Sequence, residues 1–295
     1  MILVTGGNGF VGRHVVHALR GAGRPVRCLV RSPRKAARLE ALGCELTEGD
    51  MTDAESLRRA VEEVDTILHL VAVRQGKEER FERVMIRGGN DLLAAAKEAG
   101  VRRFVLMSAL GTREDTKDLV PYYRAKWEVE QAVKGSGIDH VIFQPSFIFG
   151  RDGGIIPTFR RLVKVAPVTP VIGSGERHFQ PIWVDDVATY FEQSIDLESA
   201  TNRSFELGGP EQVTWNEFWA RFKRALGIRR RSVHVPVGLM RVNALLTERL
   251  PGDIPLTRDL LTMLEHEDNV VRDDAAQQTF HLPLVPLDEQ LRRLA

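Results

Sequence analysis

The first twelve residues constrain this chain most, because they lead from a strand-like segment into a glycine-rich loop. The loop satisfies two glycine spacings: Gly7, Gly9 and Gly12 fit G-x-G-x-x-G, and Gly6, Gly9 and Gly12 fit G-x-x-G-x-x-G. Either spacing places glycine where a tight turn, a pyrophosphate and a helix–strand contact leave no room for a Cβ atom. A helix is expected after the loop, and the N–H groups and positive dipole at its amino end favour phosphate. We therefore expect a dinucleotide to bind at this end of the helix.

Strand-like and helix-like patterns alternate over the first half of the chain. Strands are expected at Ile2–Thr5, Val26–Val30, Glu45–Thr47, Thr66–Val71, Arg103–Ser108 and His140–Gln144, and helices at Phe10–Ala22, Pro33–Leu42, Ala54–Val61, Glu79–Ala99 and Pro121–Lys134. Gly23, Gly43, Gly100 and Gly137 stand at the expected helix exits. This order predicts the α/β class: a Rossmann-type, doubly wound parallel sheet with ligands at the carboxyl ends of its strands.

The pattern changes after Gly150, where prolines cluster in a long strand-rich connection. A helix at Val184–Ile195 and a strand at Ser204–Leu207 follow, and then helices at Thr214–Leu226, Val237–Leu250, Thr257–His266 and Leu287–Leu294. We expect residues 1–150 to form the NAD(P)-binding domain, completed by about 181–208. Residues 151–180 and 209–295 are expected to form a smaller, mostly helical lobe for substrate or partner.

Composition narrows the class of protein. The chain has 295 residues, 43% of them hydrophobic and 27% charged, which is ordinary for a globular protein. A net charge of +1 gives no general attraction to nucleic acid or to an acidic membrane surface. No run approaches the roughly 18 apolar residues of a membrane span, and the first strand begins at Met1 with no leader before it. The expected location is cytoplasmic, with Cys28 and Cys44 as buried, reduced thiols.

The residues after the second strand predict the type of dinucleotide. An acidic residue there accepts a hydrogen bond from the ribose 2′-OH, whereas arginine accommodates a 2′-phosphate. Here Arg31, Ser32, Arg34 and Lys35 stand at this point, and no carboxylate occurs before Glu40. The alternative is a solvated basic helix start, but cations oppose the dipole at a helix N-terminus. NADP(H) is therefore favoured over NAD(H).

Two further segments are expected beside the cofactor. Asp50 and Met51 follow the third strand; Asp50 either accepts from the adenine amino group or caps the helix that starts near Asp53. Leu70, Val71 and Ala72 at the end of the fourth strand are small or apolar and suit packing against the cofactor.

Three residues predict carbonyl chemistry. Ser108 closes the fifth strand, and Tyr122 and Lys126 lie one turn apart on the next long helix. An ammonium group beside a phenol lowers the pKa of the phenol, so that tyrosine can act as an acid or base. The serine hydroxyl would orient the substrate carbonyl. Tyr123 is the competing partner of Lys126.

Together these residues resemble the short-chain dehydrogenase/reductase superfamily over nearly the whole chain. The chain is most similar to the atypical, extended branch, which includes NmrA-like proteins and the 39-kDa (NDUFA9-like) subunit of respiratory complex I. The motifs that carry the resemblance are Thr5–Gly12, Gly49–Asp53, Phe104–Gly111, Tyr122-x-x-x-Lys126, Pro145–Gly150, Gln180–Ala188 and Leu207–Glu211.

The resemblance implies NAD(P) bound across the strand ends, with Pro145 and Ser146 near the nicotinamide. The residues expected at the cofactor are then Gly6, Gly7, Gly9, Phe10, Val11, Gly12, Arg31, Ser32, Arg34, Lys35, Asp50, Met51, Leu70, Val71, Ala72, Ser108, Tyr122, Lys126, Pro145 and Ser146.

Four positions depart from the pattern of the family. Ala109 and Leu110 stand where extended members often carry the catalytic hydroxyl, so Ser108 has the alternative of a structural role. Trp183 replaces a common histidine, and Gln144 stands where arginine is frequent before the proline. These substitutions leave the substrate class open.

The leading hypothesis is an NADP(H)-dependent oxidoreductase or epimerase-like enzyme that acts on a carbonyl or alcohol. The first alternative is a non-catalytic NAD(P)H-binding module, either a redox sensor or an assembly factor with a protein or respiratory-complex partner. The second alternative is a nucleotide-sugar epimerase or dehydratase. A monomer or homodimer with a small-molecule substrate, and no nucleic acid partner, is expected.

Other polar and aromatic residues have structural explanations. His14, His17 and His69 lack a second ligand at zinc-like spacing, so no metal is expected. Asp185 and Asp186 are expected to cap the following helix. Two interpretations are open for Arg151, Arg177 and His178: contact with an anionic substrate, or exposure to solvent. A solvated turn is expected at Arg229–Arg231. The spacing of a helix buried in a core is followed by Trp215, Phe218, Trp219 and Phe222.

Overall fold

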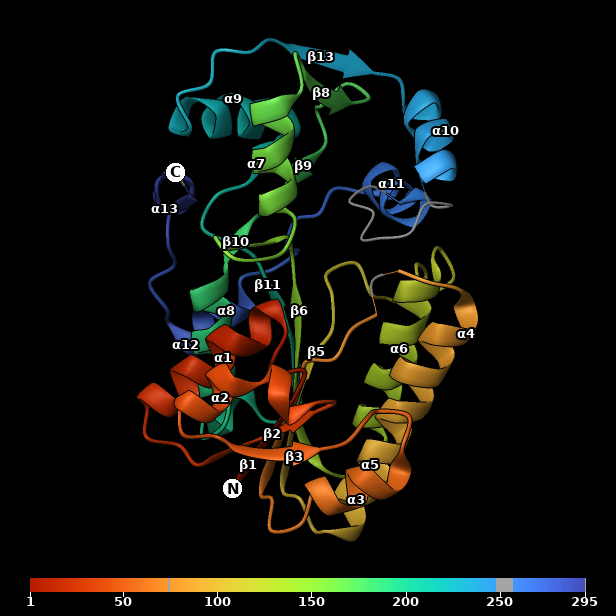
Figure 1. The fold of residues 1–295 in the computed structure, drawn as a ribbon, viewed down its shortest axis with the longest axis vertical. Helices are drawn as coiled ribbons and strands as arrows, with labels where there is room; N and C mark the ends of the chain where they lie inside the picture. The colour runs from red at the N-terminus through yellow and green to blue at the C-terminus, as the bar shows by residue number, and fades with distance from the viewer. Residues whose placement is uncertain (74, 248–256, 295) are drawn as a thin grey trace. The chain divides into compact units, whose positions relative to one another are not determined.

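The structure, a computed structural model, describes residues 1–73, 75–247 and 257–294 (Figure 1). Its contacts divide the chain into two compact units. The first unit comprises Met1–Pro145, Val184–Leu207 and Asp273–Leu282, and the second comprises Ser146–Trp183, Gly208–Arg272 and Pro283–Ala295.

A seven-stranded parallel sheet forms the centre of the first unit. Its strands are β1 (Ile2–Thr5), β2 (Val26–Val30), β3 (Glu45–Glu48), β4 (Thr66–His69), β5 (Arg103–Met107), β6 (Asp139–Pro145) and β11 (Arg203–Leu207). They are ordered β11-β6-β5-β4-β1-β2-β3, and every neighbouring pair is parallel. The chain therefore builds outward from β1 to one edge and then returns to build from β4 to the other. The carboxyl ends of β1 and β4 mark this switch point, where doubly wound sheets bind ligands.

Helices cover both faces of this sheet (Figure 1). One face carries α3 (Ala54–Ala60), α4 (Glu78–Phe81), α5 (Gly88–Glu98) and α6 (Pro121–Lys134), and the other carries α1 (Phe10–Gly21), α8 (Val184–Gln193) and α12 (Ala275–Phe280). Short helical turns complete the unit: η1 (Pro33–Lys35), α2 (Ala37–Ala41) and η3 (Glu198–Ala200). The predicted doubly wound α/β fold is confirmed.

The core explains why the strands are apolar on both sides. On one face Leu3, Ile67 and Phe104 join Leu92 and Val129 of the covering helices in a single buried cluster. On the other face Phe143 of β6 packs against Tyr190, Phe191, Phe205 and Phe280, with ring centroids 4.9 to 6.1 Å apart. Cys28 and Cys44 are buried free thiols, as expected.

Some predicted element boundaries were wrong. The helix expected at Pro33–Leu42 is divided at Ala36 into η1 and α2. The helix expected at Glu79–Ala99 contains a π-helical segment, η2 (Glu82–Arg87). That wider turn precedes Gly88, whose backbone packs so closely on the Met51 carbonyl oxygen that a Cβ atom would lie 2.4 Å from it. The four glycines predicted at helix exits all have positive φ.

The second unit combines helices with short strand pairs. Its helices are α7 (Ile156–Val165), α9 (Trp215–Ala225), α10 (Val237–Thr247), α11 (Arg258–His266) and α13 (Leu287–Leu294). Its strands pair as β7 (Ile148–Phe149) with β10 (Ile182–Trp183), β8 (Thr169–Ile172) with β13 (Ser232–Val235), and β9 (His178–Phe179) with β12 (Val213–Thr214). The end of the helix expected at Val237–Leu250 lies outside the described residues.

Two helices were missed by the sequence analysis. The helix α7 lies in the segment that was expected to be strand-rich. The helix α12 belongs by its contacts to the first unit, because Phe280 packs against Phe143, Phe205 and Tyr190. In the second unit Phe218, Trp219 and Phe222 are buried and Trp215 stacks on Phe179 at 4.2 Å, which confirms their expected place in a core. Among the described residues, no helix is both long and apolar enough to cross a bilayer.

Candidate functional site

The glycine loop lies at the switch point of the sheet, and its glycines have different structural roles. Gly6 has φ +78°, and a Cβ atom there would approach the Leu70 carbonyl carbon to 3.1 Å. Gly12 has no room at all, because its Cβ would lie 2.1 Å from the Gly6 carbonyl oxygen. The tight turn therefore falls on Gly6, and the close helix–loop contact falls on Gly12. Gly7 and Gly9 are less crowded, with nearest atoms at 3.2 and 3.1 Å.

The helix α1 begins at this loop with an uncovered amino end. Gly9 is its N-cap residue, and among the described residues no side chain makes a capping hydrogen bond there. The first N–H groups of a helix have no partner within the helix, so they are available to an anion. Val11 is buried, whereas Phe10 is half-buried and packs edge-on against His14.

A basic segment lies beside the glycine loop. Asn8 of the loop donates a hydrogen bond from Nδ2 to the Lys35 carbonyl oxygen at 3.1 Å, which links the two segments. Arg31, Arg34 and Lys35 are exposed, and within the described residues no ion pair joins them to a carboxylate. Ser32 is half-buried. Among the described residues, these three cations thus form no ion pair with a carboxylate within 4 Å.

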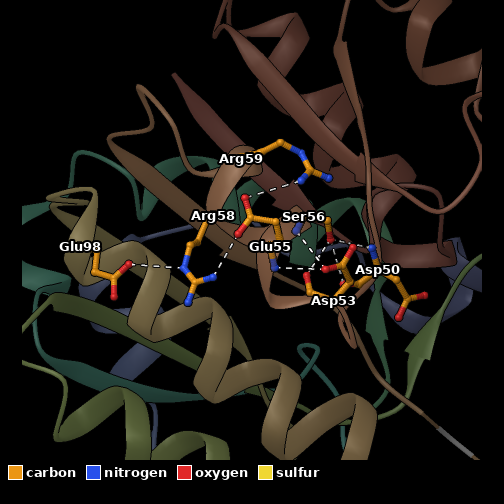
Figure 2. A network of polar contacts seen from close by, with 7 residues as sticks. All are labelled: Asp50, Asp53, Glu55, Ser56, Arg58, Arg59 and Glu98. Atoms are coloured by element: carbon orange, nitrogen blue, oxygen red, sulfur yellow. Dashed lines mark hydrogen bonds and ion pairs between the residues drawn. The ribbon is translucent and has the colours of Figure 1, made fainter.

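The segment after β3 separates the two alternatives for Asp50 (Figure 2). The N-cap of α3 is Asp53, which accepts from the backbone N–H groups of Glu55 and Ser56 at 3.1 and 3.3 Å. Asp50 instead accepts from the Thr52 hydroxyl and backbone N–H, and these bonds and Arg31 lower its pKa. The capping alternative for Asp50 was therefore wrong, and its carboxylate stays ionised beside Arg31.

The remaining residues expected at the cofactor occupy several environments. Met51 has its side chain in the buried core, so only its backbone is available to a ligand. Leu70 is buried, Val71 half-buried and Ala72 exposed at the end of β4. Pro145 ends β6, and its carbonyl oxygen accepts from the Leu110 N–H at 3.0 Å. In the second unit, the Ser146 hydroxyl donates to Asn269 Oδ1 at 2.6 Å.

The helix α6 brings Tyr122 and Lys126 onto one face. The Lys126 ammonium group donates to the carbonyl oxygen of Met107, the last residue of β5, at 2.6 Å. Its Nζ lies 5.9 Å from the centroid of the Tyr122 ring. Lys126 is only 2% exposed, and burial lowers its pKa to about 8 although Glu130 acts in the opposite direction. This places a cation next to a half-buried phenol at a carboxyl strand end.

Tyr123 and Ser108 are more enclosed than Tyr122. Tyr123 is 3% exposed and donates its hydroxyl to the Leu110 carbonyl oxygen at 3.3 Å, which ties α6 to the preceding loop. Ser108 is 2% exposed, directly after β5. Its Oγ has no hydrogen-bond partner among the residues that the structure describes.

Several other polar residues already have partners. His14 Nδ1 lies 2.5 Å from Asp185 Oδ1, so Asp185 links the first turn of α8 to α1. Arg177 and His178 both lie 3.5 Å from Asp268. Arg221, in a shallow depression of the second unit, binds Glu211 and Asp288. Over the described part of the chain, no His, Cys, Asp or Glu cluster is arranged to hold a metal ion.

Sequence reasoning missed two buried polar groups near Lys126. His69 at the end of β4 makes a 2.6 Å hydrogen bond between Nδ1 and the Thr5 hydroxyl, and burial followed by the charge of Lys126 lowers its pKa to about 3. Glu130 lies one turn beyond Lys126 on α6 and is 1% exposed. The four-residue spacing from Lys126 was a signal that could have identified Glu130.

These features together define a dinucleotide-binding α/β protein. The crowded contact at Gly12 holds the loop close to the start of α1, as the glycine loop of a dinucleotide-binding fold requires. The profile of the NAD(P)H-binding family matches residues 6–161, more than half of the chain. The chain therefore belongs to the NAD(P)H-binding family, and NAD(P)(H) is confirmed as the class of cofactor.

Known relatives have diverse roles. Photosystem II assembly factor Ycf39 of Cyanophora paradoxa is 29% identical over 227 residues, 73% of this chain and 64% of that protein. NAD(P)H azoreductase of Xenophilus azovorans is 28% identical over 231 residues, 77% of this chain and 74% of that protein. NADH dehydrogenase [ubiquinone] 1 alpha subcomplex subunit 9 of Arabidopsis thaliana is 28% identical over 222 residues, 72% of this chain and 55% of that protein. The matches thus cover less than two thirds of the first and third of these relatives.

Solved structures share the fold over almost the full length. NADPH-dependent quinone oxidoreductase QOR2 of Escherichia coli, complexed with NADPH, gives a TM-score of 0.81 at 19% identity and covers 100% of this chain and 99% of that chain. UDP-glucose 4-epimerase of Thermotoga maritima gives a TM-score of 0.78 at 21% identity. This match covers 99% of this chain and 96% of that chain. With the relatives above, they confirm the resemblance to the extended, NmrA-like branch of the short-chain dehydrogenases/reductases.

Proposed function

We propose that the protein is an NADP(H)-dependent oxidoreductase that reduces a carbonyl or quinone-like group. The observation that supports this most is the position of Lys126, which holds its charge 5.9 Å from the Tyr122 ring at the end of β5. Among known relatives, an azoreductase uses the same class of cofactor by its name. The chain shares its fold with a quinone oxidoreductase.

In this proposal Tyr122 is the proton donor. The phenol gives its proton to the substrate oxygen as negative charge develops there, and the nearby Lys126 ammonium stabilises the resulting phenolate. The Met107 carbonyl oxygen fixes the ammonium in place. Ser108 orients the substrate oxygen through its hydroxyl. When bound, the reduced nicotinamide supplies the hydride.

The preference for NADP(H) rests on Arg31, Arg34 and Lys35. They are exposed, lie beside the glycine loop and lack carboxylate partners within 4 Å among the described residues. A 2′-phosphate would provide the missing anion, through charge-assisted hydrogen bonds that a 2′-OH cannot match.

A substitution at Tyr122 tests the proposed reaction. Turnover of a panel of carbonyl compounds, quinones and azo dyes is measured by oxidation of NADPH, and in parallel of NADH. For accepted substrates, Tyr122→Phe is expected to lower kcat/KM by about 100-fold or more, because the general acid is lost. Cofactor affinity should change little, and NADPH should be the better donor.

Tyr123→Phe is the matched control, because the Tyr123 hydroxyl donates a 3.3 Å bond to the Leu110 carbonyl oxygen and lies on the same helix as Tyr122. It should keep kcat/KM within a few-fold of the native value. Unchanged turnover by Tyr122→Phe would refute the role of Tyr122, and a larger effect of Tyr123→Phe would transfer that role to its neighbour.

A non-catalytic NAD(P)H-binding module is the second candidate. Ser108 and Lys126 are each only 2% exposed, so they offer a substrate little access in this conformation. Relatives named as a photosystem II assembly factor and as a subunit of NADH dehydrogenase favour the same role. Tight NADPH binding without turnover of any compound in the panel, together with co-purification with a membrane complex, would support the module and exclude the enzyme.

A further inference from the structure

A buried carboxyl group lies one helical turn behind Lys126. Glu130 of α6 is 1% exposed, and its Oε1 accepts a hydrogen bond from Gln144 Nε2 of β6 at 2.9 Å. The same Nε2 atom donates to the Thr112 carbonyl oxygen at 3.0 Å. Gln144 is itself buried. The carboxyl group is therefore fixed between α6, the end of β6 and the loop after β5.

Among the described residues, no charged group forms a fully buried ion pair with the Glu130 carboxylate. In the described part of the chain its ion-pair partner is Lys134, at 3.6 Å from Oε2, and the Lys134 side chain is 39% exposed and thus screened by solvent. Lys126 acts on it from one turn away along α6. Gln144 offers a neutral donor, and Glu206, beside Gln144 in the register of β11 and β6, is another carboxyl group.

Three buried polar atoms of this cluster have no hydrogen-bond partner among the described residues: Glu130 Oε2, Ser108 Oγ and Thr112 Oγ1. A hydroxyl can donate to an ionised carboxylate, or accept from a protonated carboxyl group. The two protonation states of Glu130 thus call for opposite directions of a neighbouring hydroxyl.

The pKa shifts of Glu130 and Lys126 agree with a Glu130 carboxyl group that gains and loses a proton. Burial raises the pKa of Glu130, and the Ser108 hydroxyl, Gln144, Lys134 and Lys126 counteract the shift in that order, although no hydrogen bond of ordinary geometry joins Ser108 to the carboxyl group. Conversely, the charge of Glu130 raises the pKa of Lys126, which burial has lowered to about 8. Loss of that charge therefore lowers the pKa of Lys126 further.

We propose that Glu130 is a positioning residue for the reaction: its buried carboxylate, one helical turn from Lys126, holds the Lys126 ammonium group in its charged form. The role in turnover rests on the proposed function, because it requires Lys126 to serve the reaction. The coupling between Glu130 and Lys126 is a property of the protein alone and can be measured without turnover.

The direct test is a carbon-13 NMR titration of the cofactor-free protein, labelled at glutamate carboxyl and lysine side-chain carbons. Glu130→Gln and Glu128→Gln assign the two carboxyl signals, and Glu128 is the matched control because it is exposed on the same helix. Glu130 is expected to titrate above the ordinary range of a glutamate, because burial raises its pKa. The Lys126 signal should respond at the midpoint of Glu130 in the native protein, and its own midpoint should fall by about one pH unit in Glu130→Gln.

The pH profile of kcat/KM tests the functional part. In Glu130→Gln the alkaline limb should move to lower pH by about one unit, because Lys126 loses its proton sooner. Glu130→Asp, which keeps a carboxyl group, should restore part of the shift, and Glu128→Gln should leave the profile unchanged.

The outcomes separate the two proposals. A Glu130 midpoint within or below the ordinary range of a glutamate, or a Lys126 signal that does not respond to Glu130 in the native protein, overturns the inference even if one variant fails to fold. Absence of any turnover, combined with the expected NMR coupling, refutes the oxidoreductase and the role of Glu130 in it, while the Glu130–Lys126 coupling stands.

Discussion

At the scale of single residues, Lys126 combines a positive charge with almost complete burial. Its ammonium group has the Met107 carbonyl oxygen as a hydrogen-bond acceptor at 2.6 Å, and its pKa falls from 10.5 to about 8. When the pKa of a lysine is lower in the folded state than in the unfolded state, its full contribution to stability is present only at pH values above the unfolded-state pKa. That contribution is lost as the pH falls from the unfolded-state pKa to the folded-state pKa of the lysine. The difference between these two pKa values corresponds to about 3 kcal/mol in the free energy of unfolding.

Lys126→Met is therefore expected to be more stable than the native protein at pH 7, by about 1–3 kcal/mol after loss of the bond to Met107. The difference should shrink as the pH rises from 8 to 10.5. Urea unfolding at pH 7 and pH 10 measures it, with Lys97→Met of exposed Lys97 as the control. A difference between native protein and Lys126→Met that is equal at both pH values would contradict the charge burial.

At the scale of elements, the glycine loop and α1 act as one unit. A Cβ atom at Gly12 would lie 2.1 Å from the Gly6 carbonyl oxygen and 2.7 Å from the Gly7 Cα atom, both backbone atoms that cannot move independently. The helix must then shift away from the loop, which separates its amino end from the turn formed by Gly6. The expected binding of the diphosphate at this loop requires both features.

Gly12→Ala is expected to lower stability by about 1–3 kcal/mol and to weaken NADPH binding by at least about tenfold. Gly21→Ala is the matched control at the other end of α1, where a Cβ atom meets nothing within 4 Å. It should keep NADPH affinity and raise stability by about 0.5–1 kcal/mol. Thermal melting and fluorescence titration with NADPH measure both effects. Equal NADPH affinity in the two variants would show that the loop tolerates the added atom.

At the scale of the whole molecule, the first unit is assembled from three separate segments. The strand β11 pairs with β6 from Arg203 to Leu207, and α8 packs along α1. The ring of Phe143 contacts Phe191 from α8, Phe205 from β11 and Phe280 from α12. The N-terminal segment therefore lacks one edge of its sheet and part of its core when it stands alone.

A fragment of residues 1–145 is expected not to unfold cooperatively and not to bind NADPH, although it contains the glycine loop and Lys126. Removal of β11, α8 and α12 exposes the edge of β6 and the aromatic cluster around Phe143. Circular dichroism during heating and NADPH fluorescence compare the fragment with the full chain. Cooperative melting together with NADPH affinity equal to that of the full chain would show that the later segments are dispensable.

Much of the fold was predictable because its signals are local. The strands of the first half were placed within a few residues, since apolar runs and glycines mark where strands and helices begin and end. The order of β1, α1 and the glycine loop predicted the cofactor class. The π-helical segment at Glu82–Arg87 and the helix α12 were not predictable in this way, because they depend on Met51 and Phe143, which are distant in the sequence.

The sequence suggested candidate residues for the site but could not predict the contacts they make. The spacing of Tyr122 and Lys126 showed that they share a helix face, but not that Met107 holds the ammonium group. The capping residue of α3 is Asp53 and not Asp50, because cap geometry depends on the path of the loop.

The sequence by itself determined that a strand, a glycine loop and a helix open the chain and that NAD(P)(H) is the cofactor, because glycine spacing and periodicity are properties of neighbouring residues. Tertiary structure alone decided which glycine makes the turn, how deeply Lys126 is buried and that Glu130 faces Gln144 and Thr112. These features depend on how close the chain brings residues from separate elements. Burial and the resulting pKa shifts arise only when those residues pack together.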